Sequence, residues 1–187
     1  MEGRMFHRKS QAEAFEALAA ESEKSVYAVC CHMMGNSEDA MDCAQEAMLR
    51  AYRAFPSFRG DAKGSTWLIR IAMNVCLDEI RKRKKVVSLD EMREKTGFDP
   101  PDRKAAGPQE ILEAKERKRL LTEAMKKLPE DARALIILRD MQQLSYDEIA
   151  QILSLPLGTV KSRLSRARDK LSEILQKSSE LFSSHSV

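Results

Sequence analysis

The sequence predicts an all-α protein made of two small helical domains joined by a flexible linker, with a helix-turn-helix in the second domain. Ala, Leu, Glu, Lys, Arg and Met dominate the 187 residues, and runs of β-branched residues, which favour strands, are scarce. Apolar residues recur at steps of three and four along most of the chain, which is the period of a helix with one buried face. With 43% hydrophobic residues, the chain has enough apolar side chains for a globular core.

A linker between the two domains is indicated by residues 88–108, where no helical or strand period is maintained. This segment contains the helix breakers Gly97, Pro100, Pro101, Gly107 and Pro108. It separates a first domain at residues 8–87 from a second domain at residues 109–178. The serine-rich tail from Ser178 is expected to fray.

The first helix of the first domain is expected to end at Gly35 and Asn36. Its apolar stripe consists of Phe15, Leu18, Val26, Val29, Cys30 and Met33. Ser37 is the expected N-cap of the second helix, and Glu38 and Asp39 lie near the positive end of that helix.

The second helix is expected to have one buried face and one polar face, and to stop at Pro56. The residues expected to be buried are Met41, Ala44, Met48, Ala51, Tyr52 and Phe55. The polar face carries Asp42, Gln45, Glu46, Arg50 and Arg53. Periodicity alone favours an ordinary solvated helix side for this polar face.

A polar loop from Phe58 to Ser65 leads to the third helix, which is expected to begin near Thr66. This helix is expected to bury Leu68, Ile71, Ala72, Val75, Leu77 and Ile80. Trp67 is expected to belong to the core. The C-terminal end of the helix runs into a basic block, residues 81–85, in which every side chain is Arg or Lys.

In the second domain, residues 111–127 form one predicted helix, and Pro129 lies near the start of the next. The latter helix is expected to pack beneath the helix-turn-helix through Leu135, Ile136, Leu138 and Met141. The first helix of the helix-turn-helix is predicted to start at Ser145, because Ser145 and Glu148 are spaced as a capping box. Ile149, Ile152 and Leu153 lie on one face of this helix.

Pro156 and Gly158 then break the chain, and Thr159 can cap a second helix. The inward residues of this second helix are expected to be Val160, Leu164, Ala167, Leu171 and Ile174, and the outward cations are Lys161, Arg163, Arg166, Arg168 and Lys170. Asp169 is the one acid among those cations. Such one-signed charge on the second helix of a helix-turn-helix favours nucleic-acid binding over a merely solvated face.

The net charge of +3 arises from 32 basic and 29 acidic residues, so the sorted basic patches matter more than the total. No apolar run approaches the ~18 residues that span a bilayer, and no signal peptide follows Met1, so we expect a cytoplasmic protein that does not insert into membranes. The cysteines have no CxxC pair, which favours reduced thiols over a metal site; they are Cys30, Cys31, Cys43 and Cys76. The scattered histidines join no catalytic motif, so we expect no catalytic residues, no metal, no cofactor and no enzymatic activity.

Three segments of the chain, in the order in which they occur, resemble a known family. They are SEDAMDCAQEAMLRAY at residues 37–52, STWLIRIAMN at residues 65–74 and GTVKSRLSRAR at residues 158–168. Together they resemble the small extracytoplasmic-function (ECF) sigma factors of bacterial RNA polymerase, and the resemblance covers nearly all of residues 10–175. It implies that the first domain is a region-2 domain and the second a region-4 domain.

The resemblance also implies a role for the polar face of the second helix. The surface that docks on the β′ clamp helices of core polymerase is matched by Asp42, Gln45, Glu46 and Arg50. The β subunit of core polymerase is a further partner that the resemblance implies. By the same resemblance, the loop and helix from Phe58 to Asn74 hold the melted −10 element, and Gly60 and Gly64 permit close approach of a strand.

Within that −10 surface, Phe58, Arg70 and Asn74 match family positions, although a buried Phe58 and a capping or solvent-facing Asn74 are alternatives. Asn74 can bond a base edge and Arg70 a phosphate. In the basic block, Arg81, Lys82 and Arg83 are expected to follow the DNA backbone, adding affinity and salt sensitivity.

In the second domain, the match assigns the −35 element to the start of the last helix. Lys161, Ser162, Ser165 and Arg166, with Thr159 at the start of the helix, match positions that face the major groove. Arg163 and Arg168 are better candidates for phosphate contacts. Ser165 departs from relatives with a larger side chain at this position.

The function implied is a promoter-specificity subunit that directs core RNA polymerase to −10/−35 promoters, controlled by an anti-sigma factor. The alternative is a stand-alone helix-turn-helix regulator, which would bind duplex DNA without polymerase. That alternative needs only the second domain, and usually a dimerisation element.

Overall fold

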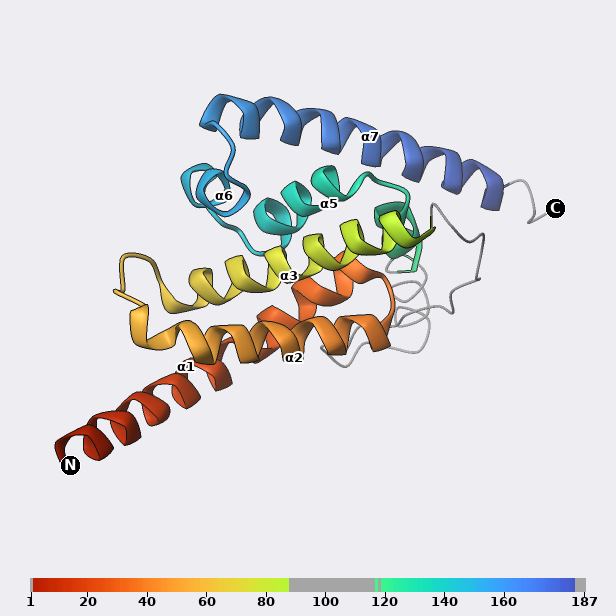
Figure 1. Cartoon of the computed structure of the whole chain (residues 1–187). Helices are drawn as coiled ribbons and strands as arrows, with labels where there is room; N and C mark the ends of the chain where they lie inside the picture. The colour runs from red at the N-terminus through yellow and green to blue at the C-terminus, as the bar shows by residue number, and fades with distance from the viewer. Residues whose placement is uncertain (1, 88–116, 118, 184–187) are drawn as a thin grey trace, which may run out of the picture. The chain divides into compact units, whose positions relative to one another are not determined.

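A computed structural model describes residues 2–87, 117 and 119–183. The chain folds as two compact units, which are described separately as unit 1 (residues 2–87) and unit 2 (residues 117 and 119–183) (Figure 1). All regular structure in these ranges is helical, which confirms the predicted all-α class. The expected linker, residues 88–108, and the expected start of the second domain at residues 109–116 lie outside the described residues.

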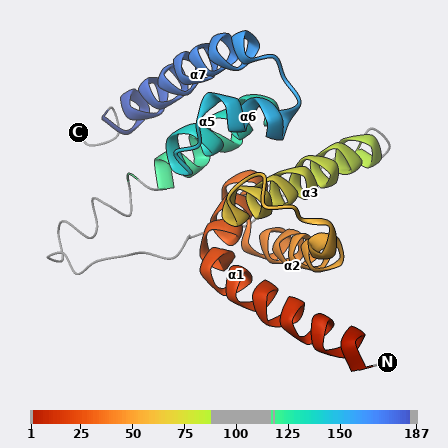
Figure 2. The same ribbon diagram turned by 90° about the vertical axis from the view of Figure 1, so that its left-hand side faces the viewer.

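Unit 1 is a bundle of long helices: α1 (Glu2–Met34), α2 (Ser37–Ala54) and α3 (Gly64–Val87). Each of the three packs against the other two, and the N-terminal turns of α1 extend beyond its neighbours (Figure 2). A 3-10 turn, Phe55–Ser57, follows α2 directly. None of the described helices combines the length and the hydrophobicity that crossing a bilayer requires.

The core of unit 1 follows most of the predicted stripes of α1 and α3, whereas Leu18, Ile71 and Ile80, which were expected in those stripes, are half-buried. From α1, the side chains of Phe15, Val26, Val29, Cys30 and Met33 are buried; from α3, those of Leu68, Ala72, Val75 and Leu77 are buried. Full burial of one large aliphatic side chain is worth about 1.5–3 kcal/mol, so these two stripes contribute substantially to the stability of the bundle.

The buried face of α2 differs from the prediction. The helix buries small residues, namely Ala40, Cys43, Ala44, Ala47 and Ala51. Met41 and Tyr52, which we expected to be buried, are 46% and 55% exposed, and Met48 and Phe55 are half-buried. Because α2 packs against both α1 and α3, small side chains at the contacts let the three backbones approach closely. The larger apolar side chains are left at the edge of the bundle.

The ends of α2 and α3 also differ from the prediction by one or two residues. Asn36, and not Ser37, is the N-cap of α2, because its side-chain Oδ1 accepts a hydrogen bond from the backbone N–H of Asp39 at 2.8 Å. Helix α3 begins at Gly64, where a Cβ atom would lie 2.5 Å from Cδ1 of Leu18 in α1. Gly64 therefore contacts the end of the Leu18 side chain closely, and a larger residue there would require Leu18 to move.

Aromatic side chains close the end of the bundle near the loop between α2 and α3. The ring of Phe15 contacts those of Tyr52 and Phe55 edge-on, each with 5.3 Å between centroids. The ring of Phe58 lies 4.7 Å from Trp67 and 6.1 Å from Phe55. Such pairs add about 0.5–1.5 kcal/mol each beyond burial, so Phe58 is fixed by packing.

Unit 2 contains a helical segment at residues 117 and 119–126, then α5 (Glu130–Ile136), α6 (Tyr146–Leu153) and α7 (Leu157–Ser183). The predicted helix at residues 111–127 is thus described only in its second half. Pro129 is the N-cap of α5, close to the expected start. Leu135, Ile136 and Leu138 are buried as predicted.

Two features of unit 2 were not predicted. Helix α5 continues as a π turn, Ile137–Met141, where an uninterrupted α-helix was expected. Helix α7 begins at Leu157, so Thr159 lies inside its first turn and is not the cap, and the backbone remains helical to Ser183. Residues 178–183 contain neither Pro nor Gly to stop the helix, and the expected fraying from Ser178 stays a prediction.

Candidate nucleic-acid interface and adjoining grooves

Local backbone and side-chain geometry fixes both ends of α6. The capping box is complete: Oγ of Ser145 accepts from the backbone N–H of Glu148 at 3.2 Å, and the Glu148 carboxylate accepts from the backbone N–H of Ser145 at 2.8 Å. Ser154 ends α6 in the left-handed conformation, with φ of 53°. The capping box thus fixes the start of α6, and the left-handed Ser154 begins the short turn that leads into α7.

Helix α7 separates its apolar residues from its cations as predicted. Val160, Leu164 and Ala167 are buried, and Leu171 and Ile174 are half-buried. The exposed side chains over the same stretch are Lys161, Ser162, Arg163, Ser165, Arg166, Arg168 and Lys170, whereas Thr159 is half-buried. The predicted −35 residues therefore share one solvent-facing surface of α7, hereafter the α7 basic face.

The cations of the α7 basic face are not equivalent. Arg168 forms an ion pair with Asp140 through two guanidinium nitrogens, one of them Nε at 3.1 Å, and these hydrogen bonds raise the pKa of Arg168. Nε of Arg166 donates to the carbonyl of Ser162 at 3.3 Å, which leaves the rest of its guanidinium exposed. Nζ of Lys161 lies 5.8 Å from the ring centre of Tyr146. Arg168 is thus already paired within unit 2.

The residues predicted to contact the −10 element lie along α3 and the loop before it. Arg70 and Asn74 are both exposed and one helical turn apart, so their side chains share a face of α3. Phe58 is half-buried on Trp67, which agrees with the packing alternative. Gly60, in the same loop, has φ of +77°, a conformation that favours glycine.

The basic block at the end of α3 contains both exposed cations and one cation that is paired within unit 1. Arg81, Lys82 and Lys84 are exposed. Arg83 is 34% exposed, forms a bidentate ion pair with Asp39 of α2, and donates from Nε to Glu79 at 2.8 Å. The hydrogen bonds to Asp39 raise the pKa of Arg83 above its ordinary value. Arg83 therefore links α3 to α2 instead of extending freely into solvent.

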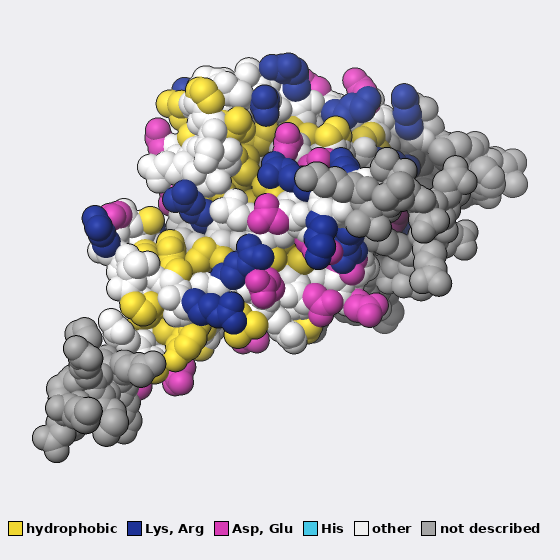
Figure 3. Space-filling view, viewed as in Figure 1, with side chains coloured by type: hydrophobic (Ala, Val, Ile, Leu, Met, Phe, Trp, Pro, Cys, Tyr) yellow, Lys and Arg dark blue, Asp and Glu magenta, His cyan; other side chains and the backbone are white. Residues whose placement is uncertain are grey.

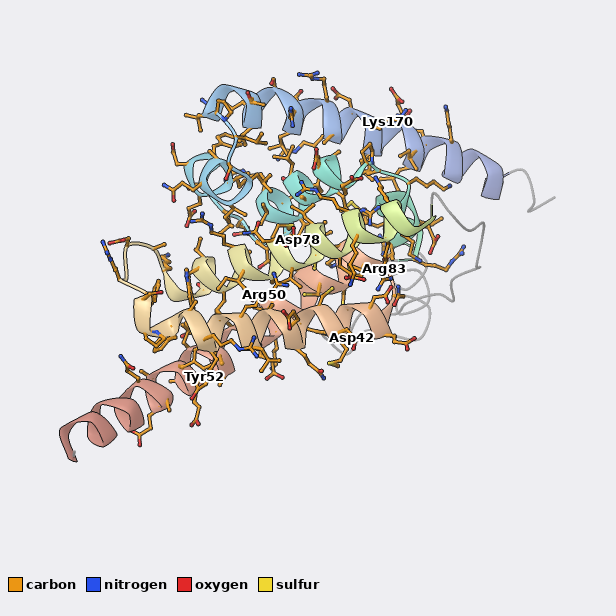
Figure 4. The ribbon with its side chains drawn as sticks, viewed as in Figure 1. Asp42, Arg50, Tyr52, Asp78, Arg83 and Lys170 are labelled. Atoms are coloured by element: carbon orange, nitrogen blue, oxygen red, sulfur yellow. The ribbon has the colours of Figure 1, made fainter. Side chains whose placement is uncertain are left out.

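A polar groove of about 300 Å³ runs between α2 and α3. Its lining consists of Asp39, Asp42, Cys43, Glu46, Arg50, Val75, Asp78, Glu79, Lys82 and Arg83. Nε of Arg50 donates to Glu46 at 2.7 Å, which raises the pKa of Arg50, and Nη1 of Arg50 lies 3.7 Å from Asp78. Charged side chains of both signs alternate over α2 and α3 (Figure 3), and Figure 4 labels four from this groove.

An apolar groove of about 730 Å³ lies between α1 and α2. Its lining consists of Phe15, Glu23, Lys24, Val26, Tyr27, Met41, Ala44, Gln45, Met48, Leu49 and Tyr52. Met41, Leu49 and Tyr52 are each about half exposed or more, at 46%, 51% and 55%. Sequence reasoning missed this groove because it assigned Met41 and Tyr52 to the core. The signal available was the Ala-rich stripe of α2, which offers an alternative buried face.

The four residues predicted to bind polymerase are divided between these two grooves. Asp42, Glu46 and Arg50 line the polar groove, and Gln45 lines the apolar groove. All four belong to α2, so this helix presents a charged edge beside an apolar one. Exposed apolar surface with a polar rim is typical of a protein-binding site.

The four cysteines are buried, reduced thiols, as the sequence predicted. They belong to α1, α2 and α3 of unit 1 and are Cys30, Cys31, Cys43 and Cys76. Within the described part of the chain, no group of His, Cys, Asp or Glu side chains is arranged to hold a metal ion.

Comparison with known families gives two matches, one in each unit. The family model of sigma-70 region 2 matches residues 18–86, and that of sigma-70 region 4 matches residues 118–171. The first match covers most of the bundle of unit 1. The second includes α5, α6 and the basic face of α7.

Individual relatives are similar over nearly the whole chain. The ECF RNA polymerase sigma factor SigW of Bacillus subtilis is 36% identical over 173 residues, which cover 90% of this chain and 92% of that protein. The ECF RNA polymerase sigma-E factor of Escherichia coli is 34% identical, with 90% of each chain covered. The sigma factor RpoE, in the co-crystal structure with the anti-sigma factor NepR from Bartonella quintana, matches with a TM-score of 0.73 and 25% identity, covering 88% of this chain and 98% of that one.

Proposed function

The chain belongs to the ECF sigma factors of the sigma-70 family, and on this premise we propose that it binds core RNA polymerase and directs it to −10/−35 promoters. The observation that carries the proposal is the presence of separate binding surfaces on two compact units of one chain. Unit 1 has an exposed polar face on α3 and grooves on α2, and unit 2 has the α7 basic face. A subunit that recognises two promoter elements while attached to an enzyme needs such an arrangement.

Unit 1 is proposed as the region-2 domain, over residues 8–87, which docks on the β′ clamp helices through α2. Asp42, Glu46 and Arg50 provide charges along the polar groove, and Gln45 borders the apolar groove. The exposed side chains of Met41 and Leu49 add apolar contact area beside those charges. An apolar edge that becomes buried on binding, next to a charged rim, supports docking of helices from another protein.

The −10 element is assigned to α3 and the loop before it. The exposed Asn74 amide can make two hydrogen bonds with a base edge, and the exposed Arg70 guanidinium, one turn away, can pair with a phosphate. Phe58, stacked near Trp67, offers an aromatic surface at the edge of the same face. Arg81 and Lys82 continue along α3 as phosphate contacts, and Arg83 would join them only by leaving Asp39.

Unit 2 is proposed as the region-4 domain, expected over residues 109–178, which places the start of α7 in the major groove at the −35 element. Its base-reading residues are proposed to be Lys161, Ser162, Ser165 and Arg166, with Thr159 in the first turn of α7. Arg163 is exposed and suits a phosphate contact. Arg168 is weaker for that role, since Asp140 already neutralises it.

We assign no catalytic step to the chain, because phosphodiester formation belongs to the core polymerase, and we place its action in the cytoplasm with that enzyme. An anti-sigma factor is the proposed regulator. The similar sigma factor RpoE was crystallised with the anti-sigma factor NepR, and the match covers 98% of that RpoE chain. The exposed apolar groove of α2 provides a surface that such an inhibitor would cover.

The direct test is transcription of a genomic fragment library by purified bacterial core polymerase, with and without the full chain. New transcripts that share a two-part upstream motif are the expected result. A matched reaction with Asn74→Ala should lose transcripts that depend on the −10 element, while binding to core polymerase stays unchanged. If core polymerase gains no transcripts and the chain alone protects a duplex site, the protein is a stand-alone regulator and the proposal fails.

A further inference from the structure

Thiols from three helices meet in the core of unit 1. Cys30 of α1, Cys43 of α2 and Cys76 of α3 are all buried, at 0%, 4% and 0% exposure. The thiol of Cys76 is hydrogen-bonded to those of Cys30 and Cys43. Cys31, the remaining cysteine, is hydrogen-bonded to the Tyr27 hydroxyl. Cys76 is therefore the thiol that Cys30 and Cys43 both contact, and Cys43 and Cys76 are neighbours within the folded bundle.

Only one member of this thiol cluster lies at the edge of the core. Cys43 lines the polar groove between α2 and α3, and neither Cys30 nor Cys76 does. The groove has a volume of about 300 Å³, which admits water and small polar molecules. Cys43 is therefore the member of the thiol cluster that borders the groove, and Cys76 is its hydrogen-bonding partner.

The surroundings of Cys43 also favour the reactive thiolate. The hydrogen bond from Cys76 lowers the pKa of Cys43, and the Arg83 guanidinium acts in the same direction. Hydrogen bonds to Cys30 and Cys43, together with burial, raise the pKa of Cys76, so Cys76 stays protonated. At Cys43, burial and the carboxylates of Glu79 and Asp39 oppose the lowering, but the net pKa is below the ordinary value. In contrast, burial raises the pKa of Cys31 to about 11. The thiolate is the nucleophile in thiol oxidation, so the two cysteines should differ in rate.

We propose that Cys43 is a site of oxidation by hydroperoxides and that Cys76 resolves the oxidised thiol into a disulfide joining α2 to α3. The Cys43 thiolate attacks one oxygen of the peroxide, which breaks the O–O bond and, after proton uptake, leaves a sulfenic acid and one water or alcohol. The Cys76 sulfur then attacks the sulfenic sulfur, and the hydroxyl leaves as water with the Cys76 proton. The two thiols lose two electrons, and the peroxide gains them.

This inference is independent of promoter recognition, because it concerns the thiols alone. The location of Cys43 nevertheless connects thiol oxidation with the proposed polymerase-docking surface, since Cys43 lies beside Asp42 and lines the same groove as Glu46. A disulfide at this place would tie together the two helices that border the proposed polymerase-docking charges.

The test is peptide mapping of the full, folded chain after brief exposure to hydrogen peroxide. Unreacted thiols are then alkylated in denaturant, and the chain is cut before aspartate. The cuts at Asp42, Asp61 and Asp78 place Cys43 in residues 42–60 and Cys76 in residues 61–77, and Cys30 and Cys31 stay together in residues 1–38. The expected product is a reducible link between residues 42–60 and 61–77.

The rates within one chain provide an internal comparison. Because the pKa of Cys43 is lowered and that of Cys31 is raised to about 11, Cys43 should be oxidised faster than Cys31 in the same chain. The control variant Cys31→Ala should form the link at the wild-type rate. In Cys76→Ala, dimedone should label Cys43 as the sulfenic acid.

The inference is overturned if residues 1–38 are oxidised first, or if the link forms only after denaturation. The wild-type chain answers both questions, so a poorly folded Cys76→Ala variant would not leave them open. Folding during the exposure is followed by the fluorescence of Trp67, the single tryptophan of the chain.

Discussion

Replacing Glu46 by arginine should weaken binding to core polymerase while leaving the fold intact. Glu46 is 44% exposed at its side chain and is paired with Arg50 of the next turn at 2.7 Å. Loss of such an exposed pair costs about 0.3–0.5 kcal/mol of stability, and two like charges at that spacing cost about 0.2–0.5 kcal/mol more. The free energy of unfolding should therefore fall by less than about 1 kcal/mol.

The effect on binding should be larger than the effect on folding. A reversed charge inside a protein interface costs about 2–3 kcal/mol, which weakens binding roughly 30- to 150-fold. The assay is competition, in which each unlabelled variant displaces a fluorescently labelled wild-type chain from core polymerase. Trp67 fluorescence during urea unfolding reports the stability of unit 1 in the same preparation.

A matched control is Glu16→Arg, which reverses an exposed charge on α1 that lines neither groove. It should bind polymerase like the wild-type chain. Unchanged competition by Glu46→Arg would remove the α2 face from the interface. A loss of stability well above 1 kcal/mol would instead show that the Glu46–Arg50 pair supports the fold, against the reasoning from its exposure.

Three further predictions test separate parts of the structure. Arg166→Ala should weaken initiation from the −35 element by about 1–3 kcal/mol at its preferred base, measured by abortive transcription on promoter variants, and an equal loss on every sequence would make Arg166 a phosphate contact. Ser145→Ala removes the acceptor for the N–H of Glu148, so hydrogen exchange over α6 should report about 1 kcal/mol less protection; unaltered exchange would mean that the capping box is not needed in solution. Gly64→Ala requires only the end of the half-buried Leu18 side chain to move, so Trp67-monitored unfolding should show a loss of at most about 1 kcal/mol; a larger loss would mean that Leu18 cannot move aside.

The helices of both units could be predicted because their signals are local. The capping box at Ser145, the stripe from Val160 to Ala167 and the breakers at Gly35 and Pro156 act within one or two turns of the backbone. The outward position of the α7 cations follows from the same period, since a helix that buries one face exposes the other. For these elements, the residues and their spacing were sufficient.

The burial of α2 could not be predicted in the same way. The helix has a stripe of large apolar residues and a stripe of small ones, and periodicity does not say which one meets a neighbouring helix. Contact with both α1 and α3 selected the small stripe, with Ala40, Ala47 and Ala51, because it permits the closer approach. The large stripe, with Met41 and Tyr52, then became the wall of a groove.

The sequence by itself determined the helical class, the helix-turn-helix and the cations of α7, because each depends on spacing along one backbone. Only the tertiary structure decided which of the basic residues are already paired, as Arg83 is with Asp39 and Arg168 with Asp140. It also brought Cys43 and Cys76 into contact from different helices. These contacts join residues about 30 to 45 positions apart, and separations of that length are set by the packing of whole helices and not by any local pattern.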